Sequence, residues 1–451
     1  MGKKRARAPI DWGAMPSLES GETAVLGRMI RPGDTLEVEI HSIGERGMGR
    51  AVISCEIGPD RRGRRITIDV RKALPGDHVS IAIDGGRGRR FSARVTRWLV
   101  EAPSRQAPRC PHFGQRETPG KGCGGCTFQN LPYPDQLALK RDEVARLLEE
   151  AGVDSNLVRP TRAAPEPWFY RNKMEFSFGD DRSREFALGL YPSGWRREVI
   201  GLSTCFLQSQ ASAELVVEVS RWCDARGLHP YRPKENTGFL RQLVVREGKR
   251  TGERLIELVT SMDEAVTFDD ASMSAVEVAR AFAAFIVGAA KRLGHTLSSV
   301  YWTQHRAVRG EKTRFVSTLL HGSVTLHEEL WLPGDRKLRY AIHPRAFFQP
   351  NTRGAEVMCE TILEASRTLI AERGGLRVLD LYCGAGNLSL CIAPFASDVL
   401  GIELNPDAVD NARDNAKKNG LKNANFAAGD VADVLEREEM TEPLANRDLL
   451  I

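Results

Sequence analysis

Four cysteines are spaced so that their thiolates could hold a metal centre. Cys110 is followed after twelve residues by Cys123, and Cys126 completes a Cys-Gly-Gly-Cys motif. The glycines let the backbone wrap, so that two thiolates can face one centre. Cys205 stands 79 positions beyond Cys126. Soft thiolates suit zinc or an iron–sulfur cluster, and spacing alone does not choose between them. The alternative is a set of buried thiols without a ligand.

A second group of residues is typical of a nucleotide-cofactor site. Val378–Leu381 has the apolar composition of a buried parallel strand, and Gly384 and Gly386 allow a tight turn after it. Glu403 ends the next apolar strand, seventeen residues after Gly386, where its carboxylate can accept both ribose hydroxyls of an adenosine. Asp430 follows a third strand and could meet the adenine amine.

Two cofactors compete for this turn. A dinucleotide fingerprint requires a third glycine at position 389, where this chain has Ser389. Asp380, just before the turn, suits the sulfonium and amino acid end of S-adenosylmethionine better than a pyrophosphate. We therefore favour S-adenosylmethionine. Cys383 lies in the turn without a nearby base, so we do not interpret it as a nucleophile.

The elements around this turn predict part of an α/β, Rossmann-like sheet. The predicted strands and helices are strands 378–381, 398–402 and 425–428 and helices 353–373 and 406–419. Asp448–Ile451 has the composition of the start of a fourth strand. An incomplete sheet exposes an edge, so we expect weak or absent binding of the methyl donor by this chain alone.

The N-terminal part predicts a small β-barrel of the oligonucleotide-binding type. Period-two strands recur at 36–40, 66–70, 79–83 and 91–95, separated by glycine and proline turns. Arginine clusters at 61–65 and 87–90 are predicted to lie in its turns, where basic groups grip single-stranded nucleic acid. Residues 1–100 hold 19 Lys and Arg against 12 Asp and Glu, and this positive charge favours a polyanionic partner.

The whole chain divides into four predicted segments. These are a disordered basic tail (1–29), the barrel (30–100), a central α+β domain with the cysteine loop (101–345) and the partial cofactor domain (346–451). Helices are expected at 135–152 and 275–293. The chain has no apolar run of membrane-spanning length and no secretory signal, so we expect a cytoplasmic protein that acts without a membrane.

Together these residues resemble the iron–sulfur-containing uridine-C5 RNA methyltransferases over residues 30–451. Cys110–Gly114 and Cys123–Leu131 are similar to that family's cluster loop, with a longer gap that implies an inserted surface loop. Thr204–Leu207 matches the segment of the fourth ligand, and Phe347–Asn351 is close to the signature before the cofactor domain. Tyr170–Lys173 and Gly189–Tyr191 resemble the central domain's entry strands.

The resemblance implies a fold and a set of ligands. The barrel would be a TRAM domain that binds RNA, and Cys110, Cys123, Cys126 and Cys205 would hold a [4Fe–4S] cluster. The positions that match contacts to S-adenosylmethionine are Gln349, Tyr382, Asn387, Glu403 and Asp430. Of these, Glu403 and Asp430 also follow from the residues themselves, whereas Gln349, Tyr382 and Asn387 rest on the resemblance.

The implied activity is the formation of 5-methyluridine in RNA, with 23S ribosomal RNA favoured over transfer RNA, by a monomer. In such enzymes a cysteine adds to C6 of a flipped uracil, which makes C5 nucleophilic enough to take the methyl group. The family's nucleophilic cysteine, its basic glutamate and its Asp-Pro-Pro-Arg motif match no position in this sequence. We therefore expect no methyl transfer by the 451-residue chain alone.

Two other functions stay open at this point. One alternative is a non-catalytic RNA-binding iron–sulfur protein that kept its binding sites. The other is a zinc-bound RNA-binding module joined to a dehydrogenase-like remnant.

Overall fold

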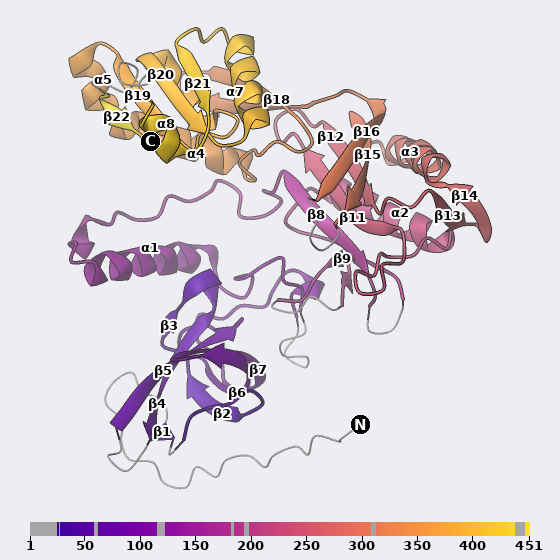
Figure 1. Ribbon diagram of the computed structural model, residues 1–451. Coiled ribbons are helices and arrows are strands. Elements are labelled where there is room, and N and C mark those ends of the chain that lie inside the picture. Colours follow the sequence, from indigo (N-terminus) through magenta and orange to yellow (C-terminus); the bar gives the residue numbers. More distant parts are fainter. Residues whose placement is uncertain are drawn as a thin grey trace. The chain divides into compact units, whose positions relative to one another are not determined.

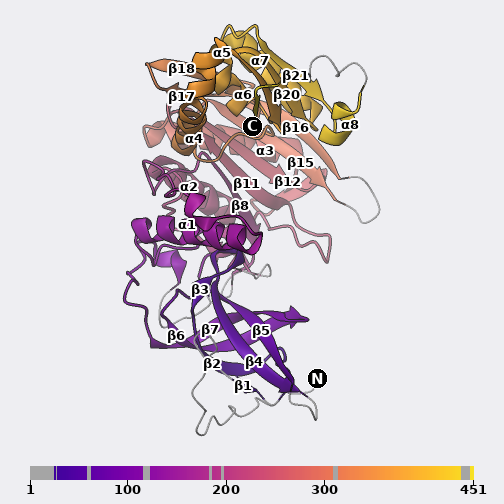
Figure 2. The ribbon, with the colours of Figure 1, turned by 90° about the vertical axis from the view of Figure 1, so that its left-hand side faces the viewer.

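The computed structural model describes residues 25–26, 28–57, 62–114, 122–181, 185–193, 198–307, 313–437 and 447–451. Residues 1–162 with 190–200 form one compact unit, and residues 163–189 with 201–451 form a second. Figures 1 and 2 show the ribbon in two views. Most of the predicted basic tail, and residues 115–121 of the predicted insertion after Cys110, lie outside the described residues.

The first unit is built on one seven-stranded sheet. Its strands run in the order β1-β4-β5-β7-β6-β2, and β3 pairs with β4. The bounds are β1 Val25–Leu26, β2 Thr35–Glu39, β3 Ser42–Ile43, β4 Gly49–Ile57, β5 Arg62–Arg71, β6 His78–Arg87 and β7 Arg90–Val100. Alternating residues of these strands form one apolar core. The four predicted strands are therefore confirmed, and the closed barrel stays a prediction.

Two predictions for this sheet need correction. Strand β4 was not predicted, because Gly44–Gly49 had been interpreted only as a turn. Within the cluster at 61–65, Arg62–Arg65 lie in β5 and pair with β4 rather than in a turn, and Arg61 lies outside the described residues. The second cluster does include a turn: β6 ends at Arg87 and β7 begins at Arg90, with Gly88 at a φ of +64° between them.

The cysteine loop and helix α1 (Tyr133–Glu150) follow the sheet within the same unit. The helix was expected at 135–152, so its existence is confirmed with a shift of two residues. Leu139 packs against a small cluster of Leu74, Ala102 and Leu131. Val144 and Leu147 of this helix are about half exposed, at 48% and 50%.

The second unit begins with a mixed sheet of order β10-β9-β8-β11-β12-β15-β16. Helices α2 and α3 pack against each other and onto this sheet (Figure 1). The strands are β8 Lys173–Gly179, β9 Ala187–Leu190, β10 Ile200–Gly201, β11 Leu240–Glu247, β12 Arg254–Thr260, β15 Ser299–Arg306 and β16 Arg314–Gly322. The remaining elements are α2 Gln210–Ala225, the hairpin β13 Ala265–Phe268 with β14 Ala271–Ser274, and α3 Ala275–Arg292.

Helix α3 shows how local sequence fixes an element. Ser274 accepts a hydrogen bond from the Glu277 backbone, and the Glu277 carboxylate accepts one from the Ser274 backbone in return. This reciprocal cap satisfies two of the donors that a helix start leaves unpaired. The helix predicted at 275–293 is confirmed.

A parallel sheet of order β21-β20-β19-β22 completes the second unit. Figure 2 shows its strands among the helices α4 to α8. The strands are β19 Leu376–Leu381, β20 Ala396–Glu403, β21 Ala424–Ala428 and β22 Leu449–Leu450. The helices are α4 Thr352–Ala365, α5 Arg367–Arg373, α6 Asn387–Ile392, α7 Pro406–Lys418 and α8 Val431–Leu435. All four predicted strands are confirmed; the single helix expected at 353–373 is two helices that meet at Ser366.

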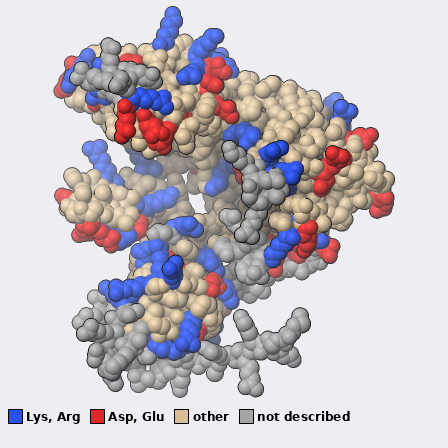
Figure 3. Space-filling view, in the orientation of Figure 1, with Lys and Arg blue, Asp and Glu red and all other residues tan. Residues whose placement is uncertain are grey.

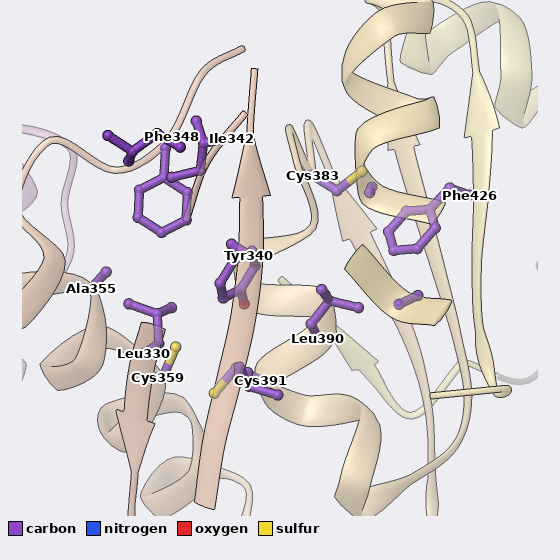
Figure 4. Packing of buried hydrophobic residues seen from close by; sticks show 14 of the residues in the cluster. Leu330, Tyr340, Ile342, Phe348, Ala355, Cys359, Cys383, Leu390, Cys391 and Phe426 are labelled. Atoms are coloured by element: carbon purple, nitrogen blue, oxygen red, sulfur yellow. The ribbon is translucent and has the colours of Figure 1, made fainter. Parts of the chain in front are cut away.

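The hairpin of β17 (Leu326–Leu332) and β18 (Arg336–Ile342) shares a core with this parallel sheet. Figure 4 shows Leu330 and Tyr340 of the hairpin beside Leu390 and Cys391 of α6 and Cys359 of α4. Hydrogen bonds of the Asn415 and Asn419 side chains also tie α7 to β18. The hairpin and the cofactor elements therefore form one packed body.

Candidate functional site

The backbone of the glycine turn after β19 lies in the left-handed region at several residues. Tyr382 has a φ of +62° and is 72% exposed, and Gly384 and Gly386 follow at +56° and +82°. A Cβ at Gly386 would stand 3.1 Å from the Phe426 ring. Figure 4 shows Cys383, a residue of this turn, and Phe426 of β21. The predicted Gly-x-Gly turn is thus confirmed, and helix α6 begins directly after it at Asn387.

Asp380 lies at the carboxyl end of β19 beneath this turn. Its Oδ2 accepts hydrogen bonds from the Ser389 backbone at 3.0 Å and from the Ser389 hydroxyl at 2.6 Å. Burial raises the pKa of Asp380 to about 6, although the bonds from Ser389 act in the opposite direction. Ser389, which replaces the third glycine of a dinucleotide motif, therefore has its own function as a partner of this carboxylate.

Glu403 is brought to the turn by the parallel pairing of β19 with β20. Its Oε2 accepts a hydrogen bond from the Gly384 backbone at 3.1 Å, and its Oε1 accepts one from the Asn405 backbone at 2.9 Å. Each carboxylate oxygen keeps a second lone pair, so both can accept a further hydroxyl group. The geometry leaves Glu403 able to bind a diol at the strand tip.

Asn387 has a buried polar atom that a ligand at the turn could satisfy. Its side chain is buried, and its Oδ1 has no hydrogen-bond partner among the described residues. Burying an amide oxygen without a donor costs about 1–3 kcal/mol. An ammonium or amide group of a ligand at the turn would remove that cost.

Asp430 and Gln349 lie at the borders of the turn. The Asp430 side chain caps α8 by accepting from the Ala432 backbone at 2.9 Å, and the preceding Gly429 donates to the Glu403 carbonyl at 3.0 Å. Phe347, two residues before Gln349, lies 3.6 Å from where a Cβ of Gly384 would be. The structure thus gathers Tyr382, Asn387 and Glu403 at one turn, with the segments of Gln349 and Asp430 beside it.

A buried polar network holds the Gln349 segment, and sequence reasoning missed most of it. Asn172 donates from Nδ2 to the Gln349 carbonyl at 2.7 Å and to the Thr352 hydroxyl at 3.0 Å. Thr352 in turn donates to the Glu328 carboxylate at 2.7 Å. Burial raises the pKa of Glu328, against the effect of its hydrogen bonds. Asn172 appeared in the sequence only within the Tyr170–Lys173 match, and no local pattern indicates Glu328.

The cysteine loop of the first unit lies against a buried lysine, Lys72, whose pKa three of its thiols influence. The ammonium of Lys72 donates to the Phe113 and Cys123 carbonyls. Burial lowers the pKa of Lys72 to about 8, while the thiol groups of Cys123, Cys126 and Cys110 act to raise it. The Gly125 backbone donates to the Cys123 sulfur at 3.4 Å. Sequence analysis did not single out Lys72.

Cys205 is buried in the second unit. Among the described residues, no group of three or more His, Cys, Asp or Glu side chains is arranged to hold a metal ion. The donor chemistry of the thiols nevertheless fits a soft metal or an iron–sulfur cluster. The predicted cluster therefore stays a prediction.

Comparison with known proteins identifies the chain's relatives. A protein named an uncharacterized RNA methyltransferase in Caldanaerobacter subterraneus subsp. tengcongensis is 34% identical over 413 residues, which cover 91% of this chain and 82% of that protein. A second protein with that description, from Chlorobaculum tepidum, is 31% identical over 93% of this chain and 82% of its own length. The chain belongs to the RNA methyltransferases.

Two further findings locate the methyltransferase fold. A methyltransferase domain model matches residues 372–449, the segment that carries the glycine turn, Glu403 and Asp430. Over 88% of its length this RNA methyltransferase superposes, with a TM-score of 0.57 and 21% identity, on 80% of a crystal structure from Pyrococcus abyssi. That structure is of a tRNA (uracil-54, C5)-methyltransferase in complex with S-adenosyl-L-homocysteine. At this identity the likeness shows a shared fold.

The described part of the methyltransferase contains no helix that is both long enough and apolar enough to cross a membrane.

Proposed function

We propose that this RNA methyltransferase is of the kind that uses S-adenosylmethionine to methylate C5 of uracil in RNA, and that its substrate is 23S ribosomal RNA rather than transfer RNA. The 451-residue chain alone is proposed to transfer no methyl group, because none of its residues matches the family's nucleophilic cysteine. The observations that carry the donor assignment are the buried Asn387 Oδ1, which has no hydrogen-bond partner among the described residues, and the Glu403 carboxylate held at the glycine turn. The uracil assignment rests on the sequence resemblance and on the fold shared with the Pyrococcus abyssi enzyme.

Each site residue has a proposed function in binding the donor. Glu403 accepts the two ribose hydroxyls, and Asp430 accepts from the adenine amine. Asn387 and Gln349 orient the amino acid end, with the exposed Tyr382 covering the adenosine. Asp380 offers its second oxygen, Oδ1, to the cationic end of the donor, since Ser389 occupies only Oδ2. When bound, S-adenosylmethionine supplies the methyl group.

Nothing in the described turn is suited to act as the attacking thiolate. Burial raises the pKa of the Cys383 thiol well above its usual range, and the charges of Asp380 and Glu403 act in the same direction. A thiol must ionise to add to C6 of uracil. Cys383 is therefore part of the packing behind the turn, where its sulfur would contact a Cβ at Gly401 at 2.7 Å.

The first unit is proposed to be a TRAM domain that binds RNA. Figure 3 shows Lys and Arg side chains distributed over the described surface of the molecule, including its seven-stranded sheet. Several arginines of this sheet are already paired, for example Arg90 with Asp69 and Arg97 with Glu37. The positive balance of residues 1–100 leaves others to meet phosphates.

Cys110, Cys123, Cys126 and Cys205 are proposed to hold a [4Fe–4S] cluster that fixes the cysteine loop. Support comes from the thiols around Lys72 and from the backbone donor on the Cys123 sulfur. Protein purified without oxygen should be brown, absorb near roughly 400 nm and contain iron and sulfide. A colourless protein that contains zinc would overturn this assignment. A Cys110→Ser variant should lose the colour, whereas Cys223→Ser, at a buried helical cysteine, should keep it.

The decisive experiment for the reaction compares RNA from cells with and without the gene. Deletion should remove one 5-methyluridine from 23S ribosomal RNA, measured by nucleoside mass spectrometry and mapped by nuclease digestion. Loss from transfer RNA instead would correct the substrate. Unchanged 5-methyluridine in both RNAs would overturn uracil methylation and support the non-catalytic RNA-binding alternative.

Donor binding is tested separately, so that the two claims can fail independently. The incomplete sheet predicted weak or absent donor binding, but the Gly384 and Asn405 backbones hold the Glu403 carboxylate at the turn. Ultraviolet cross-linking of methyl-labelled S-adenosylmethionine should therefore label residues 372–449, and S-adenosylhomocysteine should compete, whereas absent labelling would support the expectation from the incomplete sheet. Glu403→Ala should abolish the labelling, and Glu372→Ala, at an exposed position in α5, should not change it. Equal labelling of both variants would contradict the assigned site.

A further inference from the structure

The outer edge of the mixed sheet carries an aromatic cluster that the proposed donor site does not use. Strand β16 ends the sheet order, and its residues from Arg314 to Thr318 are exposed. Phe315 and Val316 are 40% and 51% exposed. Large apolar side chains on an edge strand are a liability unless they have a partner. The exposure of Phe315 therefore suggests that this edge has a binding partner.

Phe315 belongs to a stack of planar groups. It is the cross-strand partner of His305 on β15, and the two rings stack with centroids 4.4 Å apart and planes inclined by 19°. The guanidinium of Arg345 lies 4.5 Å from the centre of the Phe315 ring. Planar guanidinium and aromatic groups in contact expose further flat surfaces on which a nucleobase can stack.

A second stack adjoins the first one. The Arg241 guanidinium lies 3.6 Å from the centre of the Tyr231 ring, and its Nη1 is 3.4 Å from Nδ1 of His305. The Nε of Arg241 is buried and has no hydrogen-bond partner among the described residues. Two cations and three rings are thus linked along this edge by direct contacts.

The charge of the edge is positive. Strands β15 and β16 carry two arginines and two histidines and neither Asp nor Glu. Arg306 and Arg314 are paired in register at the end of the hairpin. Besides the phenol of Tyr231, the acidic group that acts on Arg241 is Asp263, which already accepts from the Ser261 hydroxyl. Such a surface repels cationic partners and attracts a polyanion.

Three explanations of the cluster can be weighed. A purely structural cluster would bury Phe315, and it is exposed. A protein segment that added a strand to β16 would use the backbone edge, but it would gain little from two guanidinium groups stacked on rings. Cations interleaved with aromatic rings are the combination that binds unpaired nucleotides, by stacking and phosphate contacts together.

We propose that the β15–β16 edge, with Phe315, His305, Arg345 and Arg241, is a stacking platform for an unpaired stretch of the RNA substrate. The inference rests on the proposed RNA substrate and is independent of which base is methylated. The platform binds bases through flat faces, so it recognises single-stranded rather than duplex RNA.

The test uses the full chain and a fluorescein-labelled twelve-nucleotide oligouridylate, followed by fluorescence anisotropy. Phe315→Ala should weaken binding by about 5- to 100-fold, the range for losing one stacked base. Phe315→Tyr keeps a ring and should bind within about twofold of the unchanged protein. Val316→Ala, at the exposed neighbour on the same strand, is the matched control and should bind normally. Arg345→Gln should reduce the salt dependence of binding by about one phosphate contact.

Cross-linking gives a second readout that does not depend on affinity. An oligonucleotide with 4-thiouridine should cross-link to a peptide containing residues 314–322, and duplex RNA of the same length should not. If Phe315→Ala and the unchanged protein bound the oligouridylate with equal affinity, the proposed stacking platform would be wrong. The exposed edge would then be better explained as a binding site for a protein partner. Failure of the unchanged protein to bind any RNA would overturn the proposed substrate as well, so the two failures are distinguishable.

Discussion

The glycine turn and the cysteine loop are both proposed ligand sites, and the structure organises them differently. At the turn, the backbone of Cys383 donates to Ile402 and that of Gly384 donates to the Glu403 side chain, so neighbouring parallel strands fix the site. In the cysteine loop, backbone bonds hold Cys123 and Gly124, and the proposed cluster would bring the thiols together. A sheet positions its strand tips by topology, whereas a metal site in a loop is completed by the metal.

The largest expected effect breaks the turn itself. Gly386→Val adds a branched side chain at a φ of +82° and next to the Phe426 ring. Backbone strain and overpacking together should lower the free energy of unfolding by about 2–5 kcal/mol. Gly420→Val is the matched control, because its φ is +68° and a Cβ there meets open space. Urea unfolding should show the larger loss for Gly386→Val, and equal losses would mean that crowding at the turn is unimportant.

The second effect concerns the buried carboxylate beneath the turn. The pKa of Asp380 is about 6 in the folded state against an ordinary 3.8, so the folded protein binds more protons than the unfolded chain between these values. The free energy of unfolding must then fall as pH rises through this window, by about 3 kcal/mol in total. Asp380→Asn should remove that contribution to the pH dependence.

Urea unfolding at several pH values between roughly 4 and 7 measures this change. The exposed Asp433 of α8 provides the control, since Asp433→Asn should leave the pH dependence as it is. A parallel pH dependence in the Asp380→Asn variant and the unchanged protein would show that this carboxyl does not titrate in the window.

The third prediction concerns Asn172, which directly precedes β8 and supports the proposed donor site through the Gln349 segment. Asn172→Ala leaves the Gln349 carbonyl and the Thr352 hydroxyl without their donor. The free energy of unfolding should fall by about 1–3 kcal/mol, and cross-linking of the donor should decrease with it. Asn425→Ala, at an exposed asparagine of β21, should change neither quantity. Normal donor cross-linking in a destabilised Asn172→Ala variant would limit this residue to a structural function.

Positions set by sheet topology could be predicted from the sequence, whereas contacts between distant segments could not. Glu403 was predicted because a strand tip seventeen residues after a glycine turn lies at the same sheet edge. Lys72, Glu328 and Asn172 act through partners 24 to 180 positions away, and no local periodicity records such contacts. The break at Ser366 was missed because both helices continue one apolar pattern. Strand β4 was missed because its glycine-rich start was interpreted as a turn.

The smallest expected change in stability concerns the cysteine loop. A Cβ at Gly124 would stand 2.8 Å from the Tyr191 carbonyl oxygen and 2.9 Å from the Ser193 nitrogen, so Gly124→Ala must move the loop. Because the loop adds little to the apolar core, unfolding should shift by about 1 kcal/mol or less. Iron content should fall much more, since misplaced thiolates cannot close the cluster. Gly85→Ala, where a Cβ meets nothing within 4 Å, should retain both iron and stability. Normal iron in Gly124→Ala would show that the loop tolerates displacement, and a loss of stability like that of Gly386→Val would remove the distinction between the two regions.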